Sequence, residues 1–498
     1  MNEEMKASPT LVDSGIEGFD DVLRGGLAAN RLYLIEGNPG SGKTTLALQF
    51  LIAGVKRGER CMFVTLSETE EELHASASAH GWTLDGIDIL EIIASEGSLK
   101  PDARYTMYHP SEVELGETTK AVLAEAMRIK PARLVVDSLS EVRLLAENPL
   151  RYRRQILALK QFFSRQQTTV LFIDDRTSDE RDIHLHSLAH GVISLEREVS
   201  EYGTVRRRVQ VSKLRGRSYR EGYHDFVIRR GGLDVFPRLV AAEHRTTVAR
   251  ETIQSGLAPL DALLGGGLAK GSSTLVLGPA GTGKSSLATQ YVVAAGARGE
   301  YSCIFLFDES LATFRDRSAG LGMNVDALID SGRLTVRQLD PAELSPGEFA
   351  HTVRRAVDEN NARIVVIDSL NGFLNAMPNE RFLVLHLHEL LAYLGQRGVT
   401  TILLMAQHGL VAAAPESPVE ASYLADSVLL LRYFEAMGEV RKAISVIKKR
   451  TGKHEHTIRE LVLDGGIAIG EPIRDFQGAL TGAPMSLAKL PTPGTSAT

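Results

Sequence analysis

The sequence predicts an α/β fold made of two tandem domains, each with a mainly parallel twisted sheet flanked by helices. Three observations predict it. The chain contains two copies of one unit, each copy alternates apolar strand-like runs with helical segments, and each copy has a glycine-rich loop between a strand and a helix. A chain of 498 residues is long enough for two to four domains. The repeat favours two.

The repeat is visible when the segment from residue 14 is aligned with the segment from residue 255. Lys43 then falls on Lys284, at an offset of 241, and no gap is needed over this stretch. Further along the chain Asp137 falls on Asp368, at an offset of 231, which indicates insertions between the two places. A period this long indicates two whole domains rather than short stacked repeats.

Each copy has the segment order of a parallel sheet with helical connections. Continuous apolar runs such as LYLIEG at 32–37 and IVVID at 364–368 suit strands that are buried on both faces. The last residues contain Pro, Ser and Thr but little that can be buried. The expected parts are an N-terminal extension (1–11), a first domain (12–240), a linker (241–254), a second domain (255–484) and a disordered tail (485–498).

Composition and charge exclude several classes of protein. The net charge of −6 gives no global positive field that would hold nucleic acid or an anionic membrane. The two cysteines, Cys61 and Cys303, are too few for a disulfide scaffold or a cysteine zinc site, and they suit a reducing cytoplasm. The N-terminus lacks an apolar signal segment, and no run of about 18 apolar residues occurs. We therefore expect neither secretion nor membrane spanning.

Each copy contains the G-x-x-x-x-G-K-[ST] pattern of a phosphate-binding loop, GNPGSGKT in the first and GPAGTGKS in the second. Each loop follows an apolar strand and opens a helix, so backbone N–H groups can hold phosphates and the lysine can reach the β- and γ-oxygens. The expected ATP-binding residues are Gly37, Asn38, Pro39, Gly40, Ser41, Gly42, Lys43, Thr44 and Thr45, and then Gly278, Pro279, Ala280, Gly281, Thr282, Gly283, Lys284, Ser285 and Ser286.

Two kinds of carboxylate accompany the loops. Asp137 and Asp368 each end an apolar strand, where a carboxylate can hold Mg²⁺ together with the loop hydroxyl; a strand-end aspartate that only caps a helix is the alternative. The expected Mg²⁺-binding residues are Thr44, Ser285, Asp137 and Asp368. Glu68 and Glu309 end another strand, where a carboxylate can orient water or a hydroxyl; a solvated loop glutamate is the alternative.

The two copies differ beside this glutamate. Asp308 precedes Glu309, whereas Ser67 precedes Glu68. The second site therefore has an additional carboxylate, and we expect the two sites to do different work. The expected catalytic residues are Glu68, Glu309, Asp308, Lys43 and Lys284.

Together these motifs resemble the KaiC family of RecA-like ATPases, the double-domain core of the bacterial circadian clock. The resemblance covers about residues 10–482 and includes the paired openings, both phosphate loops, the glutamate-bearing strands, and the closing SKLRG and IKKRTGKHEHTIRE segments. It implies two tandem RecA-like P-loop domains that assemble as a hexameric double ring, with ATP at the subunit interfaces.

The resemblance also implies that basic residues of a neighbouring subunit touch the bound phosphates. By motif position the basic residues are Lys213 and Arg215, on either side of Leu214, in the first ring, and Lys448, Lys449, Arg450 and His454 in the second. From the residues alone, such alternating basic strands are more often solvated, and that alternative stays open.

The family phosphorylates itself on an adjacent Ser and Thr in its second ring. Aligned on the segment ADSVLLLRYFE, these positions become Ser422 and Tyr423. Because tyrosine replaces threonine, an ordered two-site cycle is not expected. Phosphorylation of Ser422 alone is the hypothesis, and an unmodified serine is the alternative.

The sequence thus predicts a cytoplasmic ATPase that acts as a timing or signalling switch, with serine autokinase activity in the second domain. The resemblance implies as partners other copies of the chain and signalling proteins such as KaiB-like proteins, histidine kinases or response regulators; KaiA is not expected, because the tail is short. One alternative is a RecA/RadA-like or DnaB-like DNA-dependent ATPase, which the net charge and the apolar segment 408–420 disfavour. Another is a nucleotide-gated scaffold with negligible turnover.

Overall fold

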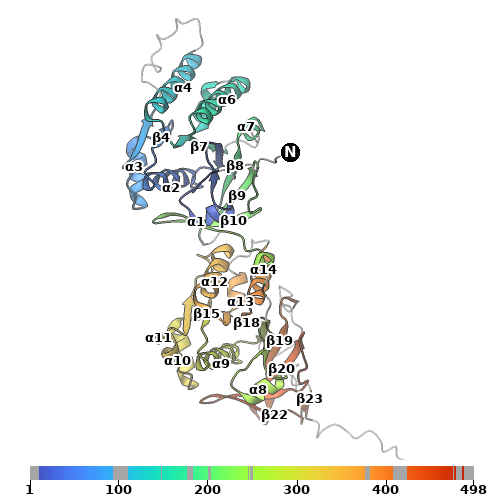
Figure 1. Ribbon diagram of the computed structural model, residues 1–498. Helices are drawn as coiled ribbons and strands as arrows, with labels where there is room; N and C mark the ends of the chain where they lie inside the picture. The colour runs from blue at the N-terminus through green and yellow to red at the C-terminus, as the bar shows by residue number, and fades with distance from the viewer. Residues whose placement is uncertain are drawn as a thin grey trace, which may run out of the picture. The chain divides into compact units, whose positions relative to one another are not determined.

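The computed structural model describes residues 10–92, 110–146, 148–176, 183–199, 203–244, 246, 249, 251–375, 382–407, 423–474, 476–477 and 485–486. The chain divides into two compact units, Met1–Arg238 and Leu239–Thr498 (Figure 1). Each unit consists of a mainly parallel sheet between two layers of helices, and this confirms the predicted α/β class.

The first unit is organised by one large sheet. Its strands are β3 (Leu32–Gly37), β4 (Cys61–Thr65), β5 (Ile87–Glu91), β6 (Arg133–Asp137), β7 (Thr169–Asp175), β8 (Gly191–Glu198), β9 (Arg206–Leu214), β10 (Tyr223–Arg229) and β11 (Gly232–Phe236). In the described residues their order is β11-β10-β9-β8-β3-β7-β6-β4-β5. The strands from β8 to β5 pair in parallel, whereas β9, β10 and β11 form an antiparallel extension.

Helices cover both faces of this sheet because its central strands are apolar on both sides (Figure 1). One face carries α1 (Glu17–Val22), α2 (Lys43–Lys56) and α3 (Glu70–Ala79). The other carries α4 (Pro110–Ile129), α5 (Leu139–Ala146), α6 (Pro149–Arg165) and α7 (Ile183–Leu188). Local sequence sets the helix starts: α3 begins with a capping box, in which Thr69 and Glu72 each accept a hydrogen bond from the other's backbone N–H.

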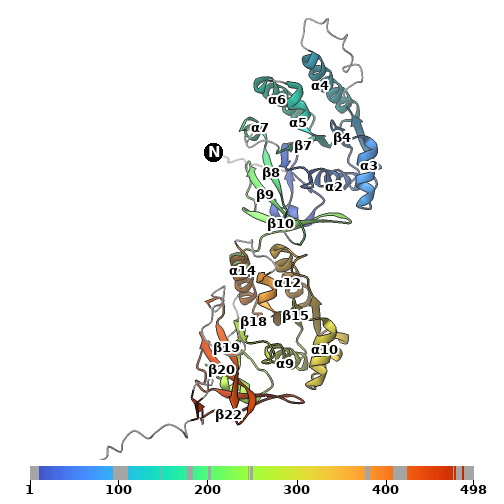
Figure 2. The ribbon, with the colours of Figure 1, turned by 180° about the vertical axis from the view of Figure 1, so that it is seen from behind.

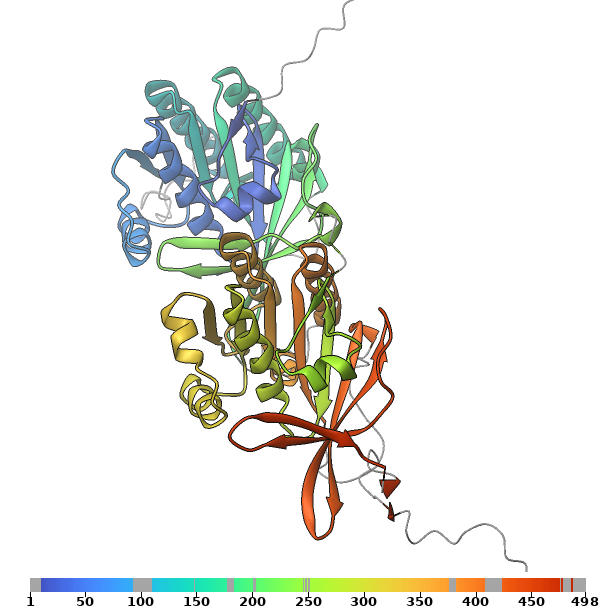
Figure 3. The same ribbon diagram turned by 60° about the horizontal axis from the view of Figure 1, so that its bottom comes forward.

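The second unit repeats this plan. Its strands are β14 (Ser273–Gly278), β15 (Ser302–Leu306), β16 (Leu334–Gln338), β17 (Ile364–Asp368), β18 (Thr400–Ala406), β19 (Ser427–Ala436), β20 (Glu439–Lys449), β21 (Arg459–Leu463) and β22 (Ile467–Pro472). In the described residues the order is β16-β15-β17-β18-β14-β19-β20-β21-β22. Figure 2 and Figure 3 show β19, β20 and β22 of the antiparallel extension at one side of this unit.

The helices of the second unit also form two layers. One layer contains α8 (Ala258–Leu263), α9 (Lys284–Ala297), α10 (Leu311–Gly320) and α11 (Val325–Asp330). The other contains α12 (Pro346–Asn360), α13 (Leu370–Asn375) and α14 (Leu383–Gln396). Among all the helices described in both units, none is long and apolar enough to cross a lipid bilayer.

The segments expected to lie outside or between the domains contribute small elements. Leu11–Val12 form β1, which pairs with β2 (Leu27–Ala28). Within the expected linker 241–254, Ala241–His244 form a 3₁₀ helix, η2, against α14, and Thr252–Ile253 form β12, which pairs with β13 (Leu268–Ala269). Of the expected tail, Met485–Ser486 pair as β24 with β23 (Phe476–Gln477), and residues 487–498 lie outside the described part of the chain.

A buried arginine anchors the start of the first unit to its core. Arg133 is 1% exposed, and its guanidinium is 2.5 Å from Glu59 Oε2 and 2.8 Å from Asp13 Oδ1. It also donates to the backbone carbonyls of Asp13 and Phe50, both at 2.8 Å. The matching position of the second unit is Ile364, which is fully buried. At this equivalent position the first unit thus has a buried charge network, and the second unit has an apolar side chain.

Replacing Arg133 should destabilise the first unit. The change Arg133→Ala leaves Glu59 beside a cavity without this cation and Asp13 with Arg57 alone, and we expect the free energy of unfolding to fall by about 3 kcal/mol. The measurement is urea denaturation followed by the fluorescence of Trp82, the single tryptophan of the chain, which lies in the first unit. The control Arg128→Ala breaks an exposed pair with Glu125 and should cost less than about 1 kcal/mol. Equal effects of the two changes would contradict the assigned role of Arg133.

Candidate functional site

In each unit the predicted phosphate loop and its carboxylates gather at the carboxyl-terminal edge of the parallel strands. Gly37 at the end of β3 is opposite Asp175 at the end of β7, and Asp137 at the end of β6 is opposite Thr65 at the end of β4. The second unit has the same arrangement, with Asp368 at the end of β17 beside the end of β15. This edge is where open α/β sheets bind their ligands.

The two glycine-rich loops have the same conformation. Gly40 and Gly42 have φ values of 74° and 102°, a region that residues with a side chain rarely adopt. A Cβ atom at Gly42 would lie 2.6 Å from Ile228 Cδ1, so a side chain there would also force Ile228 to move. The corresponding second-unit glycines, Gly281 and Gly283, have φ values of 78° and 98°. Each loop therefore turns its backbone into a cradle at the start of a helix.

The loop lysine is buried in both units and folds back over its own loop. Lys43 is 7% exposed, and its Nζ donates to the carbonyls of Gly37 at 3.0 Å and Asn38 at 3.1 Å. Lys284 Nζ donates to the carbonyls of Gly278 and Pro279, both at 2.8 Å. Burial lowers the pKa of Lys284, although Asp368 opposes this. These dehydrated ammonium groups are suited to neutralising phosphate oxygens.

A hydroxyl and a carboxylate lie together beside each lysine. Thr44 Oγ1 donates to Asp137 Oδ2 at 2.9 Å, and Ser285 donates likewise to Asp368. Burial raises the pKa of Asp137 from 3.8 to about 6, and the nearby Glu68 and Asp175 carboxylates add to this, while Thr44 and Lys43 oppose it. Such a crowded set of hydroxyl and carboxylate oxygens fits Mg²⁺, which prefers oxygen ligands.

In the first unit, one carboxylate oxygen of Glu68 has no hydrogen-bond partner among the described residues. The backbone N–H of Glu68 donates to Thr65 Oγ1 at 3.0 Å, which holds the residue at the strand end. Glu68 Oε2 is buried, and within the described residues it has no hydrogen-bond partner. Burial raises the pKa of Glu68, and the charges of Glu72 and Asp175 raise it further. A buried carboxylate oxygen without a partner is suited to accept a hydrogen bond from a water molecule or hydroxyl.

The second-unit glutamate is instead bound by an arginine. Arg317 of α10 donates from Nε to Glu309 Oε1 at 3.1 Å and from Nη2 to Oε2 at 2.9 Å. The same guanidinium lies 3.4 Å from Ser286 Oγ at the start of α9. The matching first-unit residue is Ser76, so Glu68 has no counterpart of this arginine. The exposed Asp308 accepts a hydrogen bond from Ser369 Oγ.

Sequence reasoning missed two features of these sites. Arg317 was one, because its distance from Glu309 depends on how α10 packs. The other is a pair of carboxylates in the first unit: Asp175 forms a 2.7 Å ion pair with Lys43, and Asp174 precedes it. The second unit has Met405 and Ala406 at these two positions. The sequence FIDD at the end of an apolar strand was an available signal for this pair.

The basic residues of the first unit lie at the opposite edge of the sheet. Leu214 at the end of β9 is buried and pairs with Gly191, which pairs with Tyr33 near the start of β3. Four residues of strand, about 13 Å, separate Tyr33 from the loop. Lys213 Nζ donates to the Ala189 carbonyl at 2.9 Å, and Arg215 Nη2 donates to the Ser187 carbonyl at 2.7 Å. These two cations therefore lie away from the phosphate loop of their own unit.

In the second unit, too, the basic residues lie at the sheet edge opposite the phosphate loop. Lys449 is opposite the first residue of β19, beside the start of β14, whereas Gly278 ends β14. Lys448 Nζ donates to the Ala425 carbonyl at 2.7 Å, and His454 follows in the loop after β20.

Arg450 holds the chain just after the candidate phosphorylation site. Its guanidinium donates to the Tyr423 carbonyl at 3.0 Å and lies 3.3 Å from Asp426 Oδ1. The Tyr423 side chain is half exposed, and Ser422 itself lies outside the described residues.

Comparison with known proteins agrees with this geometry. The family model described as "ATPase: KaiC" matches residues 12–240 and 253–473. The chain belongs to the KaiC ATPase family. This KaiC-family chain is 27% identical over 486 residues to circadian clock protein KaiC3 of Synechocystis sp., with 96% of this chain and 95% of that protein covered. It is also 27% identical over 487 residues to circadian clock oscillator protein KaiC of Thermostichus vulcanus, with 97% and 92% covered.

Family membership confirms the predicted resemblance and the two tandem RecA-like domains. It also supports ATP as the ligand of a KaiC-family ATPase. The loop glycines, the buried lysines and the hydroxyl–carboxylate pairs fit that ligand with Mg²⁺. Bound Mg²⁺ would supply positive charge beside Thr44 and Asp137, and beside Ser285 and Asp368.

The buried carboxylate of Asp137 should weaken the fold when no ligand is present. Because the pKa of Asp137 is higher in the folded state, the folded state binds the carboxyl proton more tightly than the unfolded state does. The free energy of unfolding therefore falls as the pH rises from about 4 to 6, and the full loss is present above pH 6. Two pKa units correspond to about 3 kcal/mol. Asp137→Asn should therefore stabilise the first unit by up to about that amount at pH 7.5 in EDTA, and very little at pH 4.

Urea denaturation followed by Trp82 fluorescence measures this effect. The matched control is Glu71→Gln, an exposed carboxyl on α3, which should leave the unfolding free energy within about 0.5 kcal/mol. An Asp137→Asn protein that is no more stable than wild type at pH 7.5 would show that the carboxylate is not strained by burial.

Proposed function

We propose that this protein is an ATP-hydrolysing timing or signalling switch that assembles as a hexameric double ring and has serine autokinase activity in its second domain. The observation that carries the assembly is the polarity of each unit, with the phosphate loop at one sheet edge and Lys213 or Lys448 at the other. A head-to-tail contact would bring the basic edge of one subunit to the loop of the next, and such contacts close into rings. The relatives named as circadian clock proteins support the timing role.

In the first site this chain's own residues have complementary tasks. Lys43 and the loop N–H groups would hold the phosphates, and Thr44 with Asp137 would hold Mg²⁺. Glu68 would accept a hydrogen bond from the attacking water and orient it, because its buried Oε2 has no partner among the described residues. Arg215 of the neighbouring subunit would stabilise the negative charge that develops on the transferred phosphoryl group.

The second site is suited to a different acceptor. Arg317 engages both oxygens of Glu309, so this carboxylate is less available to orient water than Glu68 is. Asp308 adds a second, exposed carboxylate on the same loop. We therefore assign faster hydrolysis to the first site, and transfer to a protein hydroxyl to the second, where Asp308 or Glu309 would take the hydroxyl proton.

Mixed assemblies test the contribution of the neighbouring subunit. Arg215→Ala and Lys43→Ala should each abolish most first-ring ATP hydrolysis, because such an arginine is worth about 10³–10⁵ in rate. Mixing the two variants should restore part of the activity, because some interfaces then combine an intact loop with an intact arginine. The measurement is phosphate release from well-mixed rings in a Lys284→Ala background. Activity that does not recover would indicate that Arg215 acts within its own subunit.

Ser422 is the proposed phosphoryl acceptor. It directly precedes Tyr423, whose carbonyl is held by Arg450 at the basic edge of the second unit. In a head-to-tail ring this edge faces the phosphate loop of the next subunit, so the donor would be bound by the neighbour. Tyr423 is a poor acceptor, because its phenol oxygen lies some ångströms further from the backbone than a serine hydroxyl and phosphoryl transfer tolerates only about 1 Å of misplacement.

Incubation with γ-labelled ATP tests this assignment. Ser422→Ala should remove the protein-bound label while first-ring hydrolysis continues, and the control Tyr423→Phe should keep the label. Phosphopeptide mapping identifies the modified residue. Label that persists in Ser422→Ala, or that maps to Tyr423 or Ser417, would refute Ser422 as the acceptor.

We propose a cytoplasmic location and two kinds of partner. Other copies of the chain would form the ring in the presence of ATP. Signalling proteins, such as KaiB-like proteins, histidine kinases or response regulators, would respond to its nucleotide or phosphorylation state.

A further inference from the structure

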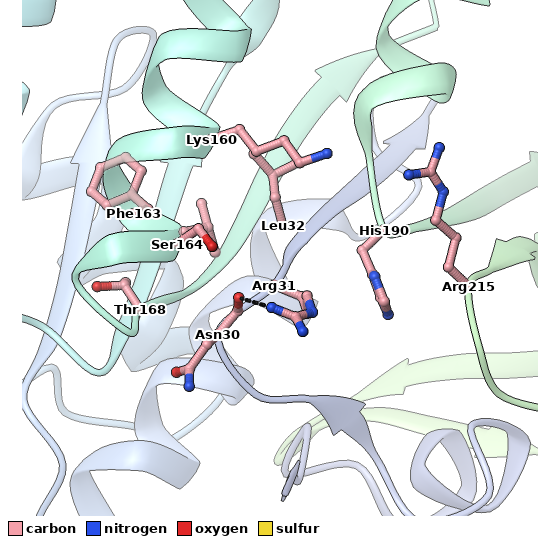
Figure 4. A pocket seen from close by; sticks show the side chains of 10 residues that line it. Asn30, Arg31, Leu32, Lys160, Phe163, Ser164, Thr168, His190 and Arg215 are labelled. Atoms are coloured by element: carbon pink, nitrogen blue, oxygen red, sulfur yellow. Dashed lines mark hydrogen bonds between the residues drawn. The ribbon is translucent and has the colours of Figure 1, made fainter. Parts of the chain in front are cut away.

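The first unit has a cationic cavity at the edge of the sheet away from its phosphate loop. The cavity has a volume of about 210 Å³, and its lining includes Arg31 just before β3, Lys160 of α6, His190 just before β8 and Arg215 just after β9. Figure 4 shows these four side chains around one hollow, although they come from distant parts of the sequence. Among the described residues that line it, none is acidic.

These cations are held close together without neutralising partners. Lys160 Nζ donates to the Leu188 carbonyl at 2.6 Å, and Arg31 donates to the Asn30 carbonyl at 3.2 Å. Within the described part of the chain, neither forms an ion pair with a carboxylate. Burial lowers the pKa of Lys160, and the charges of Arg215 and Arg31 lower it further. The positive charges of Arg31, Lys160 and Arg215 therefore repel one another, and a bound anion would reduce this repulsion.

His190 adds an unused polar atom to the same place. Its Nε2 is buried and has no hydrogen-bond partner within the described residues. Burial and then the charges of Arg31 and Arg215 lower the pKa of His190 to about 4. A hydrogen-bonding atom that is withheld from water without a partner is costly, and a bound ligand would remove that cost.

The second unit provides an internal comparison. By the repeat register, the positions of Arg31, Lys160 and His190 are occupied by Ser272, Leu391 and Asp426. Leu391 is buried in the core, and Asp426 forms a 3.3 Å ion pair with Arg450.

The backbone also closes the space in the second unit. A Cβ atom at Gly395 would lie 2.9 Å from the Gly271 carbonyl oxygen, so α14 packs directly against the loop before β14. Among its described residues, the second unit thus has the same fold with no cationic cavity at this position, which is filled by Leu391 and by the Asp426–Arg450 ion pair. The cationic cavity is therefore a property of the first unit and not a requirement of the fold.

We propose that this cavity binds a phosphate-type dianion. Guanidinium groups present several N–H donors in a fork that matches phosphate oxygens, and Lys160 adds a compact point charge. A volume of 210 Å³ holds a phosphate and a few waters, since one water occupies about 30 Å³. The ligand is free phosphate, the product of ATP hydrolysis.

Calorimetric titration with inorganic phosphate tests the free ligand. The full-length protein carries Lys43→Ala and Lys284→Ala, which silence the two phosphate loops. In this background Lys160→Leu and Arg31→Ser, which copy the second unit, should each weaken phosphate binding about 10- to 100-fold. The control Arg154→Leu removes a charge from the exposed face of the same helix and should change the affinity less than twofold. Trp82 fluorescence checks that each variant is folded, and the two variants lie on different elements.

Phosphate binding that is weakened in both Lys160→Leu and Arg31→Ser, but not in Arg154→Leu, supports the site. Variants that bind phosphate as tightly as the control overturn the proposal, and so does a background protein that does not bind phosphate.

Discussion

The shared direction of the central strands determines where every functional group lies in each unit. Because β3, β4, β6 and β7 are parallel, their carboxyl ends bring the glycine-rich loop, Glu68, Asp137 and Asp175 to one edge, although these residues are far apart in the sequence. The antiparallel strand β9 then runs back along β8, and so its last residues lie at the opposite edge. One geometric rule thus brings the phosphate loop and these carboxylates to one edge and places Arg215 at the other.

The strands and loops could be predicted from the sequence because their signals are local. The runs 32–37 and 364–368 are strands in the structure, with the bounds expected for segments that are buried on both faces. The glycine-rich loops follow from residue types at fixed spacing. The same reasoning could not find the Lys43–Asp175 or Arg317–Glu309 pairs, because a local pattern does not tell which helix face or strand end will be the neighbour.

The roles of the basic segments also depended on long-range order. SKLRG and IKKR are visible as cationic strands, but only the pairing of β9 with β8 and of β20 with β19 shows at which edge they end. The cavity lined by Arg31, Lys160 and His190 had no sequence signature, since these three residues come from a loop, a helix and the turn before a strand. What the repeat does offer is a comparison of equivalent positions, and this becomes useful once the register of the two sheets is known.

The two units illustrate how one fold can hold different internal charge. The first contains buried or half-buried cations and carboxylates at positions where the second has Ile364, Met405 and Ala406. Apolar replacements of buried ion pairs are often neutral or stabilising, so these charges are not needed for folding as such. Asp174 and Asp175 lie beside the first phosphate loop, where Asp175 pairs with Lys43, whereas Arg133 joins Asp13, Glu59 and Phe50.

The folded-back loop lysines have a kinetic consequence. Lys43 and Lys284 lose most of their hydration when the chain folds, and carbonyls of their own loops hold the ammonium groups in place. When a phosphate arrives, each lysine therefore exchanges carbonyl oxygens for phosphate oxygens as its hydrogen-bond acceptors. Neither the backbone cradle nor the lysine has to become ordered first. Capture of the ligand then needs little rearrangement, and the lifetime of the complex is governed by how quickly the phosphate oxygens can be given up.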